Sequence, residues 1–189
     1  MVKVNEKNDF FILTPSLHKM IFGNKQEKKA KRFSSFSYDS LPEWSLNGKS
    51  FFTKILDIYD GDTVTICVKI NDSYCRINCR LFGLDTPELR SQDEEEKIAA
   101  RKAKNHLVHL LTNQHIPDDC SRKQVREICE KNQQVFWIDC FSFDKYGRLL
   151  IRISKEGFNI NQKMIDDGFA GEYDGKTKAD WHSYFKHLD

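Results

Sequence analysis

The chain has 189 residues, which is enough for one domain with its own core and an additional arm or tail. Its 30 Lys and Arg residues face 28 Asp and Glu residues, so the formal net charge is only +2. This balance excludes a general cationic attraction to nucleic acid, and any phosphate binding must use locally placed arginines.

No segment approaches the roughly 20 consecutive apolar residues of a membrane helix. The apolar run at residues 10–13 is too short for the core of a signal peptide. The six cysteines form no CxxC pair and no zinc-finger pattern, which favours free thiols in a reducing compartment. We therefore expect an intracellular protein, cytoplasmic, nuclear or packaged in a particle, that has no membrane partner.

Residues 1–47 differ in composition from the rest of the chain. They contain two prolines, a serine-rich stretch and a basic cluster at residues 25–32. We expect a partly ordered N-terminal arm here, followed by a folded domain at residues 48–189. The basic cluster is open to two interpretations: a nuclear address or phosphate-binding arm, or simply a solvated run of charges.

The folded domain begins with strand patterns. Aromatic and β-branched residues predict strands at 50–59, 63–70 and 74–84, and the Asp60-Gly61 and 71–73 turns join them into a meander. Helical spacing follows at 96–112. The remaining expected elements are a short helix at 121–131, strands at 134–140 and 148–153, a helix at 159–167 that ends at Gly168, and a small helix at 177–188. This order predicts an α+β, mainly β fold: a five-stranded OB-fold barrel with two to three helices.

Charged residues cluster where these strands end. A phosphodiester cleavage site needs fixed positive charge for the phosphate, a positioned water and a proton acceptor. A hard divalent cation held by carboxylates supplies charge and orients water, and arginines donate paired hydrogen bonds to phosphate oxygens. The residues that fill these roles are Asp62, Arg80, Asp85, Glu88 and Arg148.

Each feature alone has an ordinary structural explanation. Asp60-Gly-Asp62 is typical of a turn, and the segment from Asp85 to Glu88 reads equally well as the end of a strand or the entry to a helix. A single arginine near a turn is usually a surface charge. The joint occurrence of these residues at strand ends is what favours a site.

Three segments, at residues 58–64, 79–88 and 144–148, resemble the signature blocks of the staphylococcal nuclease family, in the same order. The resemblance covers roughly residues 50–173. It implies a calcium-dependent (Ca²⁺) nuclease that cuts DNA and RNA with little sequence or sugar specificity and leaves 3′-phosphate ends.

The resemblance also implies roles for individual residues. Asp62, Asp85 and the carbonyl of Thr86 would bind calcium, Glu88 would hold the attacking water, Arg80 and Arg148 would bind the scissile phosphate, and Lys145 and Tyr146 would contact a neighbouring phosphate.

The sequence departs from the family pattern in three places. The stretch before the first helix is short and acidic at residues 93–96, a polar insertion occupies residues 113–133, and only Tyr173 remains where bacterial members have two tyrosines. Stacking of a base or sugar on Tyr173 is therefore a further expectation.

Two other functions stay open at this point. A catalytically silent OB-fold would bind nucleic acid without cutting it, although a pure binder has no need of the complete set of carboxylates and arginines. The basic arm could instead recruit the protein to a nucleic-acid assembly. We expect a monomer by default, and we expect calcium to stabilise the folded protein because the three carboxylates crowd one pocket.

Overall fold

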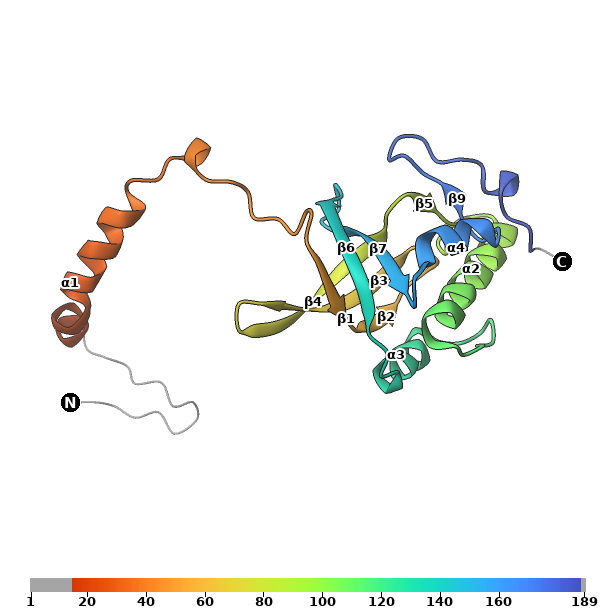
Figure 1. The fold of residues 1–189 in the computed structure, drawn as a ribbon, viewed down its shortest axis with the longest axis horizontal. Helices are drawn as coiled ribbons and strands as arrows, with labels where there is room; N and C mark the ends of the chain where they lie inside the picture. The colour runs from red at the N-terminus through yellow and green to blue at the C-terminus, as the bar shows by residue number, and fades with distance from the viewer. Residues whose placement is uncertain (1–14, 188–189) are drawn as a thin grey trace. The chain divides into compact units, whose positions relative to one another are not determined.

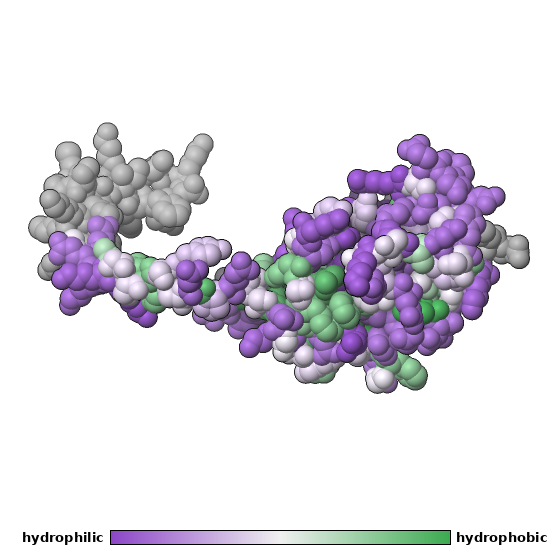
Figure 2. Space-filling model, turned by 90° about the horizontal axis from the view of Figure 1, so that it is seen from above, coloured by the Kyte–Doolittle hydropathy of each residue, from purple (hydrophilic) through white to green (hydrophobic). Residues whose placement is uncertain are grey.

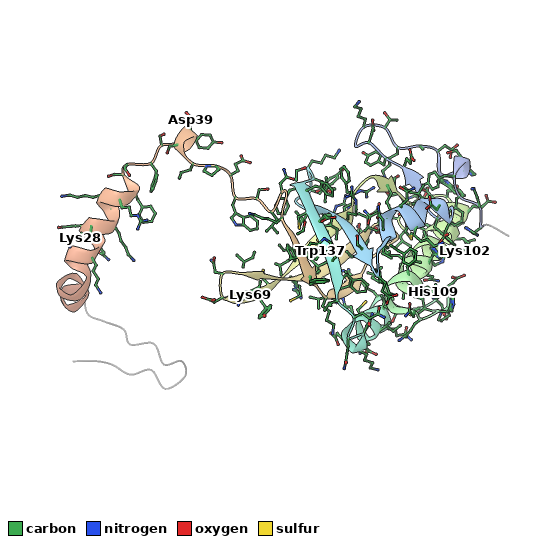
Figure 3. All side chains as sticks on the ribbon, in the orientation of Figure 1. Lys28, Asp39, Lys69, Lys102, His109 and Trp137 are labelled. Atoms are coloured by element: carbon green, nitrogen blue, oxygen red, sulfur yellow. The ribbon has the colours of Figure 1, made fainter. Side chains whose placement is uncertain are left out.

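The computed structural model describes residues 15–187, and the chain divides into a unit that ends at Trp44 and a unit that begins at Ser45. In the first unit, helix α1 spans Pro15–Phe33 and a single 3₁₀ turn, η1, spans Tyr38–Ser40 (Figure 1). The basic cluster at 25–32 forms exposed turns of α1, from which Lys28 projects (Figure 3). This helix is not among the elements expected from the sequence. The apolar run at 10–13 lies outside the described residues.

The second unit contains a seven-stranded sheet in the order β1-β6-β7-β4-β3-β2, with β8 paired to β7. Neighbouring strands are antiparallel except for the parallel pair of β4 and β7. The strands are β1 Ser50–Thr53, β2 Ile55–Ile58, β3 Thr63–Ile70, β4 Ser73–Leu81, β6 Phe136–Phe143, β7 Leu149–Lys155 and β8 Phe158–Asn159. A separate two-stranded sheet joins β5 Leu84–Asp85 to β9 Gly171–Glu172.

The α+β, mainly β class is confirmed. The described residues, however, form more than the five strands expected from the sequence. The expected strand 50–59 divides at Lys54 into β1, which pairs with β6, and β2, which pairs with β3. These two strands lie at opposite ends of the sheet order, and a single residue, Lys54, joins them along the chain. No backbone hydrogen bonds pair β1 with β2, so strand pairing does not close the sheet into a barrel. The expected strand 74–84 also divides, because Gly83 turns the chain with a φ of +84° between β4 and β5.

Four further elements are helical: α2 Glu94–Thr112, α3 Arg122–Lys131, α4 Ile160–Asp166 and the 3₁₀ turn η2 Trp181–Ser183. Helix α2 starts two residues earlier than expected, because the Asp93 side chain caps it by accepting from the Glu95 N–H. Ser121 and Asn159 cap α3 and α4 as the sequence indicates. The expected helix at 177–188 is wrong over its described part, where only η2 forms, and Leu188 lies outside the described residues.

The core lies between the sheet and helices α2, α3 and α4. Alternate residues of β7, Leu149, Ile151 and Ile153, are fully buried and pack with Leu107 and Leu111 of α2. On the face that Figure 2 shows, the surface of the second unit is mainly hydrophilic, with hydrophobic residues gathered on one part of it. None of the described helices is both long enough and apolar enough to cross a membrane.

Candidate active site

The turn between β2 and β3 places Asp62 inside the protein. Gly61 permits this, because a Cβ atom at that position would lie 2.9 Å from both the Ala103 Cβ and the Thr86 Cγ2. The Asp62 N–H donates to the Asp60 carboxylate, which closes the turn. Asp62 itself is only 3% exposed. The absence of a side chain at residue 61 therefore brings the turn, α2 and Thr86 together.

Arg80, near the end of β4, joins two buried carboxylates. Its Nη1 lies 2.5 Å from Asp62 Oδ2, and its Nη2 lies 2.5 Å from Asp85 Oδ1 and donates to the Leu84 carbonyl. All three ionic side chains are at most 10% exposed. Burial alone would lower the pKa of Arg80, but Asp62 and Asp85 raise it, so this guanidinium stays charged.

The favourable contacts of the Asp62 carboxylate do not fully offset the cost of burying its charge. Desolvation raises its pKa to about 8, and the nearby charge of Asp60 acts in the same direction. Arg80 and the Thr63 hydroxyl, which donates to Asp62 Oδ1 at 2.7 Å, lower the pKa but do not cancel the effect. The site is therefore short of positive charge near Asp62.

Arg148 joins the same network from the other side. Its Nε donates to Asp144 Oδ2 at 2.7 Å, and its Nη1 donates to the Thr63 hydroxyl at 3.1 Å. Asp144 also accepts from the backbone N–H groups of Tyr146 and Arg148, and these bonds fix the turn that begins β7. Through Thr63, Arg148 is thus connected to Asp62 and then to Arg80.

Glu88 lies at the outer end of the network. Its side chain is 55% exposed and accepts a hydrogen bond from Lys178, whose Nζ also lies 3.0 Å from Asp85 Oδ1. Partial burial alone would lower the pKa of Lys178, but the hydrogen bonds to Glu88 and Asp85 raise it. The Glu88 N–H donates to the Glu96 carboxylate of α2, which holds this loop against the helix.

A cleft of about 800 Å³ opens over these groups. Eight of the nine residues singled out from the sequence line it, and Asp85 lies behind them, bonded to Arg80 and Lys178. Tyr173 lies with its ring centroid 5.7 Å from the Arg80 guanidinium carbon, whereas Tyr146 is 73% exposed at the rim. The eight lining residues are Asp62, Arg80, Thr86, Glu88, Lys145, Tyr146, Arg148 and Tyr173.

Sequence reasoning missed several residues of this cleft. Thr63 and Asp144 lie inside segments already noted, and their polar side chains were the only available signal. Lys178 lies 90 positions after Glu88, in a segment expected to form a small helix, and nothing in the sequence points to its place in the site.

The oxygen donors present fit a hard divalent cation. Within residues 15–187 no three His, Cys, Asp or Glu side chains are grouped closely enough to hold a metal alone. Two buried carboxylates, Asp62 and Asp85, stand beside Thr86, and carbonyl oxygens and waters complete the shells of calcium and magnesium. The shortage of positive charge at Asp62 is what an added cation would relieve.

A family model described as staphylococcal nuclease homologue matches residues 78–187. The match covers more than half of the chain, so the chain belongs to this family, which is one of nucleases that typically use calcium. An uncharacterized protein of Methanocaldococcus jannaschii is 27% identical over 153 aligned residues, which cover 74% of this chain and 67% of that protein. The family match begins inside β4, so the position of Asp62 in the site rests on the structure.

Proposed function

We propose that this protein is a calcium-dependent nuclease that hydrolyses phosphodiester bonds of DNA, RNA or both. The observation that carries the proposal is one connected network around one cleft. From one end to the other, the contacts run Arg148, Thr63, Asp62, Arg80, Asp85, Lys178 and Glu88. Five of these residues were singled out from the sequence because phosphodiester chemistry needs their charges.

The two arginines serve the phosphate. Arg80 and Arg148 both line the cleft, and Asp62, Asp85, Asp144 and Thr63 hold their guanidinium groups in place. Fixed donors need no reorganisation when negative charge builds up on the phosphate oxygens in the transition state. The arginines therefore bind the scissile phosphate and stabilise its transition state.

Glu88 serves the attacking water. Its half-exposed carboxylate lines the cleft and accepts a proton as the water oxygen bonds to phosphorus. The bond from phosphorus to the 5′ oxygen then breaks and the leaving oxygen takes up a proton from solvent water, which leaves a 3′-phosphate and a 5′-hydroxyl. Asp62, Asp85 and the Thr86 carbonyl hold the metal, which when bound supplies positive charge and orients water.

The remaining residues of the cleft bind the substrate without reading its sequence. Lys145 and Tyr146 lie together on the rim, with the Lys145 Nζ 5.1 Å from the Tyr146 ring centroid, and we assign them to a neighbouring phosphate. Tyr173 presents a ring on which a base or sugar can stack, and every base has such a face. Phosphate and stacking contacts carry little sequence information, so we expect little specificity.

We further propose that the sheet of the second unit is the five-stranded OB-fold barrel of the family. In this interpretation β1 and β2 are the two halves of one bent strand, which pairs with β6 through its first half and with β3 through its second half. The nuclease domain then comprises residues 48–189 and works as an intracellular monomer, with residues 1–47 as its arm.

The direct test is product analysis with the purified full-length chain. Single-stranded DNA and RNA oligonucleotides labelled at the 5′ end are incubated with calcium, with magnesium or with a chelator. We expect cleavage of at least one substrate with calcium and none with the chelator. A phosphatase should then shift the labelled products on a gel, because they carry 3′-phosphates.

Two results would contradict the proposal. Products that phosphatase does not shift would exclude the proposed bond cleavage. Binding of the oligonucleotides without any cleavage in calcium, by protein shown to be folded, would favour the silent binding protein instead.

A further inference from the structure

Lys178 occupies the place where the outer carboxylates of the site meet. Its ammonium group contacts Glu88 Oε1 and Asp85 Oδ1, the second at 3.0 Å. Asp85 Oδ1 is also the oxygen to which Arg80 donates. A single carboxylate oxygen is thus shared by two cations of the chain itself, and Asp85 is one of the two residues proposed to hold calcium.

The fold delivers Lys178 to this position from the C-terminal segment. Before it, β9 pairs with β5, and the Tyr173 N–H donates to the Gly83 carbonyl at 3.0 Å. After it, Trp181 and Phe185 pack on Ala99 and Ala103 of α2. The loop that carries Lys178 is tethered at both ends, so its ammonium group stays within reach of the same two carboxylates.

The neighbouring lysine shows that this contact is particular to Lys178. Lys176 belongs to the same loop and also lines the cleft, but its side chain is 84% exposed and pairs only with Asp174, at 3.7 Å. The Lys178 side chain is 46% exposed and makes hydrogen-bonded pairs with two acids of the site. Lys176 therefore provides a matched control for the same charge without the same contacts.

We propose that Lys178 is an internal competitor of calcium, which holds Asp85 and Glu88 in the metal-free protein and leaves Asp85 when the ion binds. This inference rests on the proposed calcium site. Two cations that use one carboxylate oxygen repel each other, so binding of the ion and retention of the Lys178 contact oppose each other. By linkage, the opposition is reciprocal: calcium weakens the lysine contact, and the lysine weakens calcium binding by the same factor.

The consequence is that the site becomes active only above a certain calcium concentration. At low calcium, Lys178 keeps Glu88 paired with an ammonium group, and a carboxylate held in this way is a poorer acceptor for the proton of water. At high calcium, the lysine leaves Asp85, and its contact with Glu88 is weakened because one of its two anchoring carboxylates is lost. The half-exposed position of Lys178 keeps the competition weak enough to be overcome.

The test is titration calorimetry of calcium into the full-length wild type and three variants, K178M, K178R and K176M, without nucleic acid. We expect K178M to bind calcium about three- to tenfold more tightly than the wild type. K178R retains a cation that can reach the carboxylates, so its affinity should lie close to that of the wild type. K176M should also match the wild type, because its lysine touches neither acid.

Thermal unfolding gives a second readout that does not depend on activity. Metal-free K178M should melt below the metal-free wild type, because Asp85 and Glu88 lose a partner. Saturating calcium should raise the melting temperature of K178M by more than that of the wild type. A merely structural lysine would lower both melting temperatures equally.

Equal or weaker calcium affinity of K178M, with binding by the wild type intact, would overturn the competition and leave the proposed nuclease standing. An equal gain in K176M would also overturn it, by showing a general effect of charge. If neither the wild type nor K178M bound calcium, the calcium site itself would be wrong and the competition with it.

Discussion

The inner and outer halves of the candidate site are built differently. The inner half, Asp62, Arg80 and Asp85, lies at the ends of β-strands or directly beside them, and none of its residues is more than 8% exposed. The outer half, Glu88, Lys178 and Tyr146, lies on loops and on the C-terminal segment, and its side chains are about half exposed or more.

The difference separates two physical tasks. Buried charges must be paired, so the inner half is locked in one arrangement on which folding and chemistry both depend. Exposed ion pairs contribute little to stability and rearrange easily, which suits groups that meet water and substrate. We therefore expect changes in the inner half to affect folding strongly as well as activity, and changes in the outer half to affect mainly activity and metal affinity, with little change in stability.

The largest effect is expected from Arg80→Met. This change leaves Asp62 and Asp85 buried without their shared partner, so the free energy of unfolding of the metal-free protein should fall by about 3–5 kcal/mol. Urea denaturation of wild type and variant measures it. Arg76→Met, on an exposed position of the same strand, is the control and should change little. A loss below about 1 kcal/mol for Arg80→Met would show that the inner half is not locked.

Arg148→Lys should spare the fold but not the chemistry. Lysine keeps the charge and loses the paired donor geometry, so kcat/KM should fall about 10²–10³-fold. The melting temperature should change by no more than about 2 °C, because lysine keeps a positive charge beside Asp144. The matched control is Arg152→Lys, four residues further along the chain in β7, which contacts Asp139 and Phe141. Equal losses of activity in both variants would argue against a phosphate role for Arg148.

The pH dependence of stability tests the buried Asp62. Its pKa of about 8 in the folded protein exceeds the ordinary value of 3.8, so the folded state binds more protons between these values. Stability from this group is therefore present at acidic pH and is lost as the pH rises toward 8. In chelator, the stability of Asp62→Asn relative to the wild type should rise by about 3–4 kcal/mol between pH 5 and pH 8. Asp72→Asn, in an exposed turn, should show no such trend, and a flat difference for Asp62→Asn would refute the assignment.

The smallest effect is expected in the outer half. Metal-free K178M should lose about 0.3–1 kcal/mol of unfolding free energy, because its ion pairs are about half exposed. Chemical denaturation in chelator at 0.15 M salt measures the loss, with K176M beside it. A loss of several kcal/mol would place Lys178 with the locked inner half and break the comparison.

The same division explains what the sequence could predict. The inner half follows strand patterns and short motifs, so the sequence alone predicts that Asp62, Arg80 and Asp85 lie near strand ends. The helix caps at Ser121 and Asn159 also follow from local chemistry, whereas the cap at Asp93 starts α2 two residues before the expected position. These features depend on neighbours in the chain.

Features that depend on distant contacts could not be predicted. The interruption at Lys54 arises because one stretch of chain must pair with both β6 and β3. Over its described residues, 177–187, the C-terminal segment forms only a 3₁₀ turn, and its Trp181 and Phe185 pack on Ala99 and Ala103 of α2. Lys178 reaches Glu88 from the same segment, and no local pattern records that contact.

The central claim is that the site cuts phosphodiester bonds with Glu88 as the proton acceptor. The activity of Glu88→Gln tests it most directly, because this change replaces the carboxylate by an amide of the same size. Cleavage of a single-stranded DNA carrying a fluorophore and a quencher is followed for wild type and variant, with calcium and with chelator. We predict calcium-dependent cleavage by the wild type, a loss of about 10²–10⁴-fold in kcat for the variant, and equal melting temperatures within about 2 °C. Near-wild-type turnover by a folded Glu88→Gln protein would contradict the account.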